Sequence, residues 1–379
     1  MDFEFSREQQ LLSDSLRRFL GERYRFEARR GIVRSAEGWS REIWSALAEM
    51  GLLGLHAPEE YGGAGDAPVE TLLTMTAFGR ALLVEPYLPS AILATSLIRD
   101  LASPAQKKTL LPPMVAGERI TVPAHDEAAT RHALSHVATS AARKDDGFAL
   151  NGRKAVILHA AAADDLLISA RTSGDTEAED GISLFVVKRD APGVSLSAYP
   201  TLDEQRAAEV VLRDVSVPRG ALVGPEGGAF AAIRAAWDVA IAALCAEAVG
   251  ALQAILDATL EYAKTRKQFG VPIGTFQALQ HRMAEMLIHV EQARSMSYLA
   301  ALRCRDPDPL ARGKAVSAAK VLVGQACRRV GQEAIQLHGG MGMTDELAVS
   351  HYFKRLTVIE LSFGDTEHHL ERFARWEAR

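Results

Sequence analysis

Hydrophobic side chains in the first third of the chain recur at helical spacing. The order Ser6-x-x-Gln9 is that of a capping box, which starts a helix by satisfying its free N–H groups. An apolar stripe accompanies it, made by Phe5, Leu11, Leu12, Leu16, Phe19 and Leu20. The same reasoning predicts helices over 41–50, 69–83 and 110–117. Residues 1–120 are therefore predicted to form an N-terminal helical domain.

The pattern changes to short β-rich runs between residues 121 and 223. Predicted strands lie at 155–158, 165–170, 182–187 and 209–217. Turn-forming clusters separate them at 145–147, 151–152 and 173–181. Closely spaced short strands of this kind predict a small middle β domain, either a barrel or a sandwich.

From residue 224 the helical pattern returns in much longer segments. Helices are predicted over 229–267, 277–305 and 310–337, and a last one starts near Thr366. Long helices with alanine-rich seams usually pack as an antiparallel four-helix bundle and often oligomerise through it. The predicted fold class is thus α+β and multidomain, with domains at 1–120, 121–223 and 224–379.

The apolar stretch 239–256 is about as long as a membrane span. It is mostly alanine, and Glu247 and Gln253 interrupt it, so a helix buried in a bundle or at a subunit interface is the expected structure. We therefore expect no membrane association.

Composition and charge narrow the function classes. Hydrophobic residues make up 48% and charged residues 24% of the chain, as in ordinary soluble proteins. The net charge of -5 argues against nucleic acid, because duplex binding needs concentrated positive charge. The three cysteines show no CxxC spacing, and the first ten residues lack an apolar signal region. We expect a cytoplasmic protein without disulfides or a metal site.

Two C-terminal motifs suit a bound dinucleotide. The first runs from Tyr262 to Gly270 and contains Arg266, whose planar guanidinium can grip a pyrophosphate through two hydrogen bonds. In the same motif Phe269 can cover an adenine edge. The second is Gln336-Leu-His-Gly-Gly-Met-Gly342, whose double glycine lets backbone amides approach phosphate or adenosine oxygens. Taken alone, the arginine is also compatible with a surface charge, and the glycines with a plain helix C-cap.

Together these motifs resemble the acyl-CoA dehydrogenase family, and so do the run 5–15, the PEEYGGAG loop at 58–65 and the segment 213–224. The resemblance covers the whole chain. It implies FAD as cofactor, an acyl-CoA substrate, electron-transfer flavoprotein as oxidant and a homo- or hetero-oligomer. It also implies that the adenosine-diphosphate half of FAD is bound across a subunit interface by Arg266, Gln268, Phe269, Gln277, Gln336, Gly339, Gly340 and Thr366.

Two segments that face the flavin ring in the family differ here. The family reads roughly T-E-P-x-A-G-S-D where this chain has residues 122–130, which include His125 and Glu127. At the Trp-Ile-Thr/Ser element this chain has Val156 and Leu158. Valine cannot stack on an isoalloxazine ring, and leucine donates no hydrogen bond. The ring half of this chain's own cofactor site is therefore expected to be impaired.

The catalytic base of the family is also missing. The base removes the α-proton of the thioester while a hydride leaves the β-carbon, and it usually comes from a Tyr-Glu-Gly-Thr-like loop. Here the loop places Gly364 at the base position, and Ala240 stands where one branch has its glutamate. Asp365 is the nearest substitute, although a turn or N-cap role suits it too. We expect His368 and His369 to be packing or solvent residues; His338 suits either a cofactor contact or a cap.

Two functions follow from the resemblance, with a third as an outlier. The chain is an FAD-dependent acyl-CoA dehydrogenase subunit that catalyses on its own, or it is a non-catalytic partner that lends the adenosine-end contacts to a related catalytic chain. Loss of the ring and base residues, with retention of the adenosine-end motifs, favours the partner role. The beginning and the end of the chain also resemble the small subunit of the two-subunit pimeloyl-CoA dehydrogenases. A flavin monooxygenase or oxidase on the same fold is the third possibility.

Overall fold

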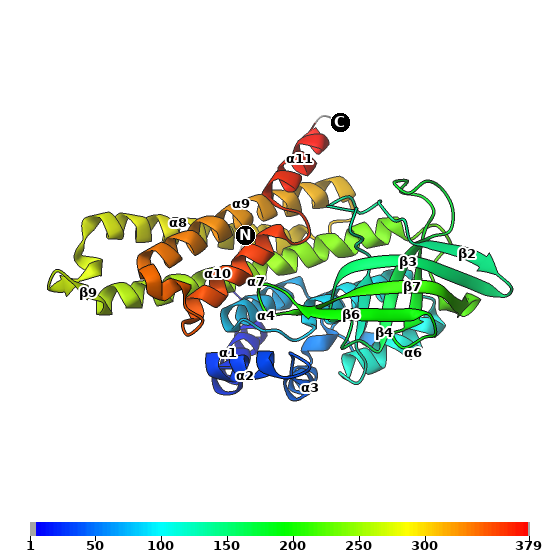
Figure 1. Cartoon of the computed structure of the whole chain (residues 1–379), viewed down its shortest axis with the longest axis horizontal. Helices are drawn as coiled ribbons and strands as arrows, with labels where there is room; N and C mark the ends of the chain where they lie inside the picture. Colours follow the sequence, from blue (N-terminus) through cyan, green and yellow to red (C-terminus); the bar gives the residue numbers. More distant parts are fainter. Residues whose placement is uncertain (1–4, 378–379) are drawn as a thin grey trace. The chain divides into compact units, whose positions relative to one another are not determined.

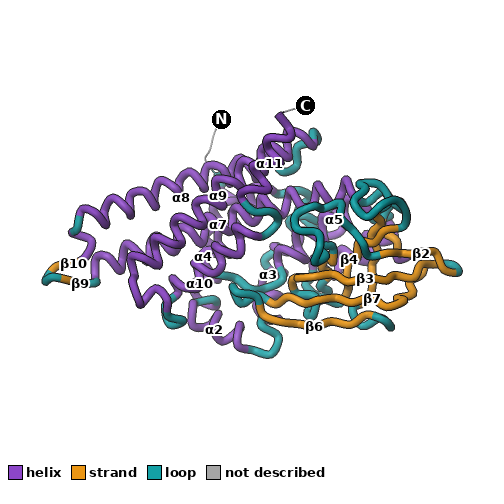
Figure 2. The backbone as a smooth tube through the Cα atoms, turned by 45° about the horizontal axis from the view of Figure 1, so that its top comes forward, coloured by secondary structure: helices purple, strands orange, loops and turns teal. Residues whose placement is uncertain are grey.

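The computed structural model describes residues 5–377, as helices, strands and the turns between them (Figures 1 and 2). The chain contains a helical N-terminal part, a β-sheet part and a C-terminal helical bundle, which confirms the predicted fold class. By internal contacts it separates into two compact units. The first takes residues up to 31, 68–83 and from 241 onward; the second takes 32–67 and 84–240.

The first unit is helical. Its elements are α1 (Arg7–Arg23), α4 (Pro68–Ala81), most of α7 (Phe230–Thr265), α8 (Gln277–Arg303), α9 (Pro309–His338), α10 (Ala348–Leu361) and α11 (Thr366–Glu377). A short hairpin, β9 (Lys267–Gln268) and β10 (Val271–Pro272), connects α7 to α8, followed by a 3-10 turn, η5 (Ile273–Thr275). Another 3-10 turn, η6 (Gly339–Met343), connects α9 to α10. The predicted capping box of Ser6 and Gln9 is present at the start of α1.

Close backbone contact and a buried ion pair fix α7 within this unit. A Cβ on Gly79 of α4 would lie 1.8 Å from the carbonyl oxygen of Glu247, so only glycine allows this approach. The Glu247 carboxylate accepts two hydrogen bonds from Arg355 of α10, at 2.6 and 2.7 Å, and both side chains are buried. In the most apolar stretch of 18 residues of α7, 94% of the window is buried inside the protein. This agrees with the prediction of a helix buried in a bundle.

The second unit holds the β sheet together with short helices. The helical segments are α3 (Arg41–Glu49), η1 (Leu52–Gly54), η2 (Glu59–Tyr61), the π-helix η3 (Tyr87–Ala94), α5 (Thr95–Leu101), α6 (Pro104–Val115) and η4 (Arg219–Ala221). One further helix, α2 (Phe26–Arg34), spans the boundary between the units. The strands are β1 (Thr121–Ala124), β2 (Ser140–Lys144), β3 (Gly147–Leu158), β4 (Asp165–Arg171), β5 (Ile182–Lys188), β6 (Val194–Pro200), β7 (Arg206–Pro218) and β8 (Leu222–Val223).

The strands form one mixed sheet in the order β6-β7-β3-β2-β4-β5-β8, with β1 paired to β4. The long pair β3–β7 is antiparallel, and its register shifts between Lys154 and Ile157. Two residues of β3 there, Ala155 and Val156, oppose the single residue Glu209 of β7, which makes a β-bulge at 155–156. Val156 in this bulge has φ +55°, a left-handed conformation that β-branched residues rarely adopt. The strained bulge lies at the element where the family places its flavin-stacking tryptophan.

Candidate cofactor site

The two predicted dinucleotide motifs lie side by side at one end of the helical bundle. The Tyr262 ring of α7 stacks on the His338 ring of α9, with centroids 4.4 Å apart and planes 24° from parallel. The Tyr262 hydroxyl also donates to the His338 carbonyl oxygen at 3.4 Å. Arg266 follows one helical turn after the tyrosine, and Gly339 comes directly after the histidine. One end of the bundle therefore presents both motifs together.

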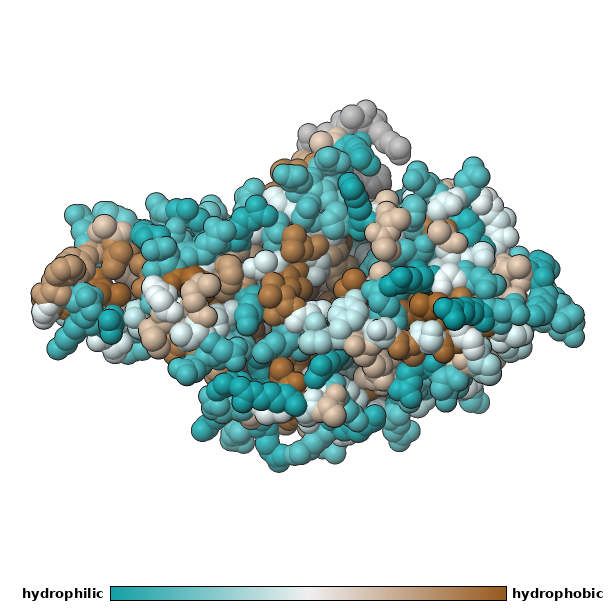
Figure 3. Space-filling view, in the orientation of Figure 1, coloured by the Kyte–Doolittle hydropathy of each residue, from teal (hydrophilic) through white to brown (hydrophobic). Residues whose placement is uncertain are grey.

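The side chains of the first motif extend from the β9–β10 hairpin into solvent. Arg266, Gln268 and Gln277 are exposed. The Phe269 ring is 91% exposed and contacts Phe276 edge to face at 6.2 Å. Figure 3 shows the apolar surface at this end of the bundle. The exposed Phe269 ring and Arg266 guanidinium are therefore accessible to a ligand.

The second motif, residues 336–342, exposes a glycine backbone without side chains at Gly339 and Gly340. Gln336, Gly339 and Gly340 are exposed. Gly339 ends α9 with φ +59°, and a Cβ added at either glycine would meet no atom within 4 Å. Among residues 5–377 no atom lies close to either Cβ position, so a phosphate or an adenosine can approach the glycine backbone from that side. The adenosine end of a dinucleotide therefore fits the residues present.

Thr366, also predicted to contact the cofactor, uses its side-chain hydroxyl for a contact within the chain. It begins α11, and its hydroxyl donates to the Glu360 carboxylate at 3.1 Å. The same carboxylate accepts from Arg328 at 3.1 Å. The assignment of Thr366 and of the other adenosine-end residues to FAD remains a prediction.

Val156 and Leu158, which by the sequence resemblance stand at the family's ring-facing element, lie in the second unit. Val156 is 54% exposed on the bulge of β3, and Leu158 is partly exposed two residues further on. The bulge is held by Glu209, whose carboxylate accepts from the Val156 N–H at 3.4 Å and from the Tyr199 hydroxyl at 3.1 Å. Neither aliphatic side chain stacks on a flavin or donates a hydrogen bond to it. The residues present do not fit an isoalloxazine ring.

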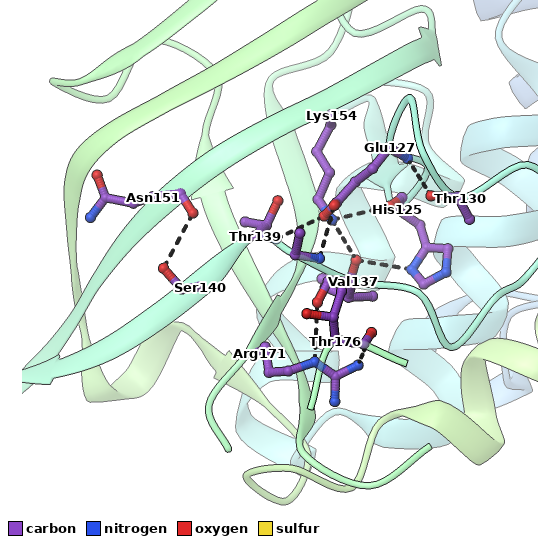
Figure 4. A network of polar contacts seen from close by, with 12 residues as sticks. His125, Glu127, Thr130, Val137, Thr139, Ser140, Asn151, Lys154, Arg171 and Thr176 are labelled. Atoms are coloured by element: carbon purple, nitrogen blue, oxygen red, sulfur yellow. Dashed lines mark hydrogen bonds and ion pairs between the residues drawn. The ribbon is translucent and has the colours of Figure 1, made fainter. Parts of the chain in front are cut away.

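Next to the bulge, a buried lysine ties the family's flavin-facing segment to the sheet (Figure 4). The fully buried Lys154 ammonium donates to the His125 carbonyl oxygen at 3.0 Å, to Glu127 Oε1 at 2.8 Å and to Ser169 Oγ at 3.0 Å. The Glu127 carboxylate also accepts from the Ala138 and Thr139 amides, both at 2.9 Å. The segment 125–139 is thus pinned by internal contacts.

The pKa values in this network follow from its burial and from the ion pair. Burial alone would raise the pKa of Glu127, but Lys154 and the hydrogen bonds from Thr139 lower it to about 2. Burial, and then the Lys154 charge, lower the pKa of His125 to about 3. This imidazole is therefore neutral, with Nε2 donating to the Leu134 carbonyl and Nδ1 accepting from Ser169, each at 2.9 Å. In this network the Glu127 carboxylate is paired with Lys154 and the His125 ring is neutral, as expected of a structural core.

The position of the family's base is closed. Gly364 is buried with φ +101°. A Cβ on it would lie 2.5 Å from His368 Cδ2 and 2.8 Å from His369 Nε2. Asp365 instead caps α11, because its Oδ1 accepts from the His368 N–H at 2.8 Å. The predicted cap role is thus present, while the catalytic role of Asp365 remains a prediction.

Lys320 of α9 supports this loop from inside the bundle, a role that the sequence analysis did not predict. Its buried ammonium donates to the Glu360 and Gly364 carbonyl oxygens, at 2.8 and 2.7 Å. Burial lowers the pKa of Lys320. A buried lysine between apolar helical residues gives no sequence signal, because lysine most often lies at the surface.

Helical, β and helical parts follow one another along the chain, and one end of the bundle presents the two motifs predicted to bind a dinucleotide. Family models match along the chain: acyl-CoA dehydrogenase N-terminal domain over residues 6–118, middle domain over 126–215 and C-terminal domain over 229–377. A probable acyl-CoA dehydrogenase of Bacillus subtilis, YngJ, is 30% identical over 97% of this chain and 97% of its own length. The chain belongs to the acyl-CoA dehydrogenase family.

Solved structures agree with this assignment. Butyryl-CoA dehydrogenase from Megasphaera elsdenii matches with a TM-score of 0.91 at 26% identity, covering 100% of both chains. A chain of the ChsE4-ChsE5 complex from Mycobacterium tuberculosis matches with a TM-score of 0.89 at 28% identity, covering 100% of this chain and 99% of that one. FAD is the cofactor that these relationships support.

Proposed function

We propose that this chain is the non-catalytic partner subunit of a heteromeric acyl-CoA dehydrogenase. In this proposal the chain binds the adenosine end of an FAD molecule, and a related, catalytic chain binds the flavin ring of the same molecule. One observation carries the proposal: the adenosine-end groups are open to solvent at the end of the bundle, whereas the base position at Gly364 is closed by His368 and His369.

The division of the site into a fitting and a non-fitting half supports this role. Arg266, Phe269 and the Gly339–Gly340 backbone suit the adenosine diphosphate, and Val156 does not suit the ring. An enzyme acting alone needs both halves and a base. The likeness to a chain of the ChsE4-ChsE5 complex is consistent with pairing between two related chains.

The proposed reaction of the complex is α,β-dehydrogenation of an acyl-CoA thioester. Bound FAD supplies the acceptor for the hydride from the β-carbon, and the catalytic chain supplies the base for the α-proton. This chain binds and orients the cofactor. From the resemblance to the small subunit of pimeloyl-CoA dehydrogenase we further propose a medium-chain dicarboxylyl or similar CoA thioester as substrate. We also propose electron-transfer flavoprotein as oxidant, a cytoplasmic location and a role in fatty acid metabolism.

The competing function is an acyl-CoA dehydrogenase that works as a homo-oligomer with Asp365 as base. The visible spectrum of the chain expressed alone separates the two. The partner role predicts a colourless chain that becomes yellow only when purified with its related chain. A chain that is yellow alone, with about one FAD per subunit, and that bleaches on addition of an acyl-CoA would overturn the proposal.

A further inference from the structure

The loop 361–365, which runs from the last residue of α10 to the residue before α11, is held by two buried donor side chains, Lys320 and His369. Lys320 Nζ donates to the carbonyl oxygens of Glu360 and Gly364. His369 Nε2 is 3.0 Å from the carbonyl oxygen of Phe363, and His369 Nδ1 is 3.2 Å from Ser317 Oγ. Three backbone carbonyl oxygens, two in the loop at 363 and 364 and one just before it at 360, therefore accept hydrogen bonds from side chains of α9 and α11.

His369 has little freedom to move. Its side chain is completely buried, and both ring nitrogens are within hydrogen-bond distance of a partner. Burial, together with the charges of Lys320 and Arg372, lowers its pKa to about 2, so the ring is neutral and donates to the Phe363 carbonyl. His368 packs against it at 90°, with ring centroids 5.1 Å apart, and is only partly buried.

A side chain placed on Gly364 would project toward these two rings. Its φ of +101° is a conformation that only glycine adopts without strain, and the Cβ position falls within 3.1 Å of three ring atoms. His368 can turn away because its ring is partly exposed, but His369 cannot. A side chain at 364 therefore demands a different loop.

We infer that the loop 361–365 is a built-in closure of the base position, with Lys320 and His369 as its positioning residues. The inference rests on the proposed partner role and deepens it. The chain does not merely lack a carboxylate at 364; it holds a backbone shape in which no carboxylate can be placed there. Loss of catalysis in this chain is then a property of the packed loop, and a single substitution back to glutamate does not restore a base.

The test uses two glycine substitutions in the full chain. Gly364→Ala introduces the Cβ that meets the histidines, whereas Gly340→Ala introduces one that meets no atom within 4 Å. Thermal unfolding should show a midpoint for Gly364→Ala about 3–8 °C below wild type, and a midpoint for Gly340→Ala within about 2 °C of it. Combining Gly364→Ala with His368→Ala should recover part of the loss. Equal midpoints for the two glycine variants would overturn the closure.

Amide hydrogen exchange tests the positioning residue separately. Lys320→Met keeps the length of the stem and removes both donated bonds, so exchange at the amides of 365–369 should accelerate at least roughly tenfold. Amides in the middle of α8 serve as the internal reference, and Lys320→Leu, which likewise donates no hydrogen bond, replaces the variant if the methionine chain does not fold. Unchanged exchange at 365–369 contradicts the role of Lys320. These readouts need no flavin, so their failure is distinct from a yellow chain, which would remove the partner role itself.

Discussion

Replacing Lys154 by methionine should destabilise the β-sheet unit far more than a surface lysine substitution does. Lys154 is fully buried and donates three hydrogen bonds, one of them to Glu127. Without it the Glu127 carboxylate, whose side chain is 7% exposed, is left as a buried charge without a cation. Removing one member of a buried pair costs about 3–5 kcal/mol.

The pKa of Glu127 gives an independent magnitude. It falls from 4.5 to about 2 in the folded chain. At roughly 1.4 kcal/mol for each pKa unit, this corresponds to about 3 kcal/mol. Lys144→Met is the matched control, because Lys144 on β2 pairs with Asp214 at 3.2 Å in a largely exposed ion pair. Such surface pairs contribute about 0–1 kcal/mol.

Urea unfolding followed by circular dichroism measures the difference between the two variants. The double variant Lys154→Met/Glu127→Gln should be more stable than Lys154→Met alone, because it leaves no buried charge. If Lys154→Met unfolds at the same urea concentration as Lys144→Met, the network shown in Figure 4 does not hold the segment 125–139.

Three further predictions follow from the site. Since the pKa of Glu127 is lowered in the folded chain, its contribution to stability is present above pH 4.5 and is lost as the pH falls from 4.5 toward 2. The free energy of unfolding of Glu127→Gln should therefore fall less steeply than that of the wild type over this pH range. Identical curves would contradict the ion pair. Asp365→Asn keeps the capping oxygen and should leave turnover of the complex unchanged, whereas Asp365→Ala should cost the chain about 1 kcal/mol; a hundredfold drop in turnover for the asparagine variant would make Asp365 the base. Phe269→Ala should lower the FAD content of the complex without changing the unfolding midpoint of the chain, because the ring is 91% exposed; full FAD occupancy would remove Phe269 from the site.

Most of the helical architecture was predictable from periodicity and capping. The capping box at Ser6 is present, and α8 and α9 begin within one residue of the predicted positions. The four predicted strands lie within β3, β4, β5 and β7. Six strands were not predicted: the short strands β1 and β2, the largely exposed edge strand β6, and the two-residue strands β8, β9 and β10. Such segments gain their structure from pairing with neighbours more than from their own propensity.

The sequence predicts candidate residues only for the adenosine end of the site, and their contact with FAD stays a prediction. Arg266, Phe269 and the double glycine form recognisable motifs because their spacing is local. The closure at Gly364 depends on residues from α9 and α11 that meet only in the folded chain, and the bonds of Lys320 and His369 leave no trace in hydrophobic periodicity. The same holds for the buried Lys154, since a lysine in a strand reads as an exposed position.

The central claim is that this chain lends one end of a cofactor site to a related chain and has no complete site of its own. The ratio of FAD to polypeptide in the complex purified with that related chain tests it most directly. The account predicts one FAD for every two chains, released when Arg266→Ala is introduced here. One FAD for every chain, or a ratio that Arg266→Ala leaves unchanged, would contradict it.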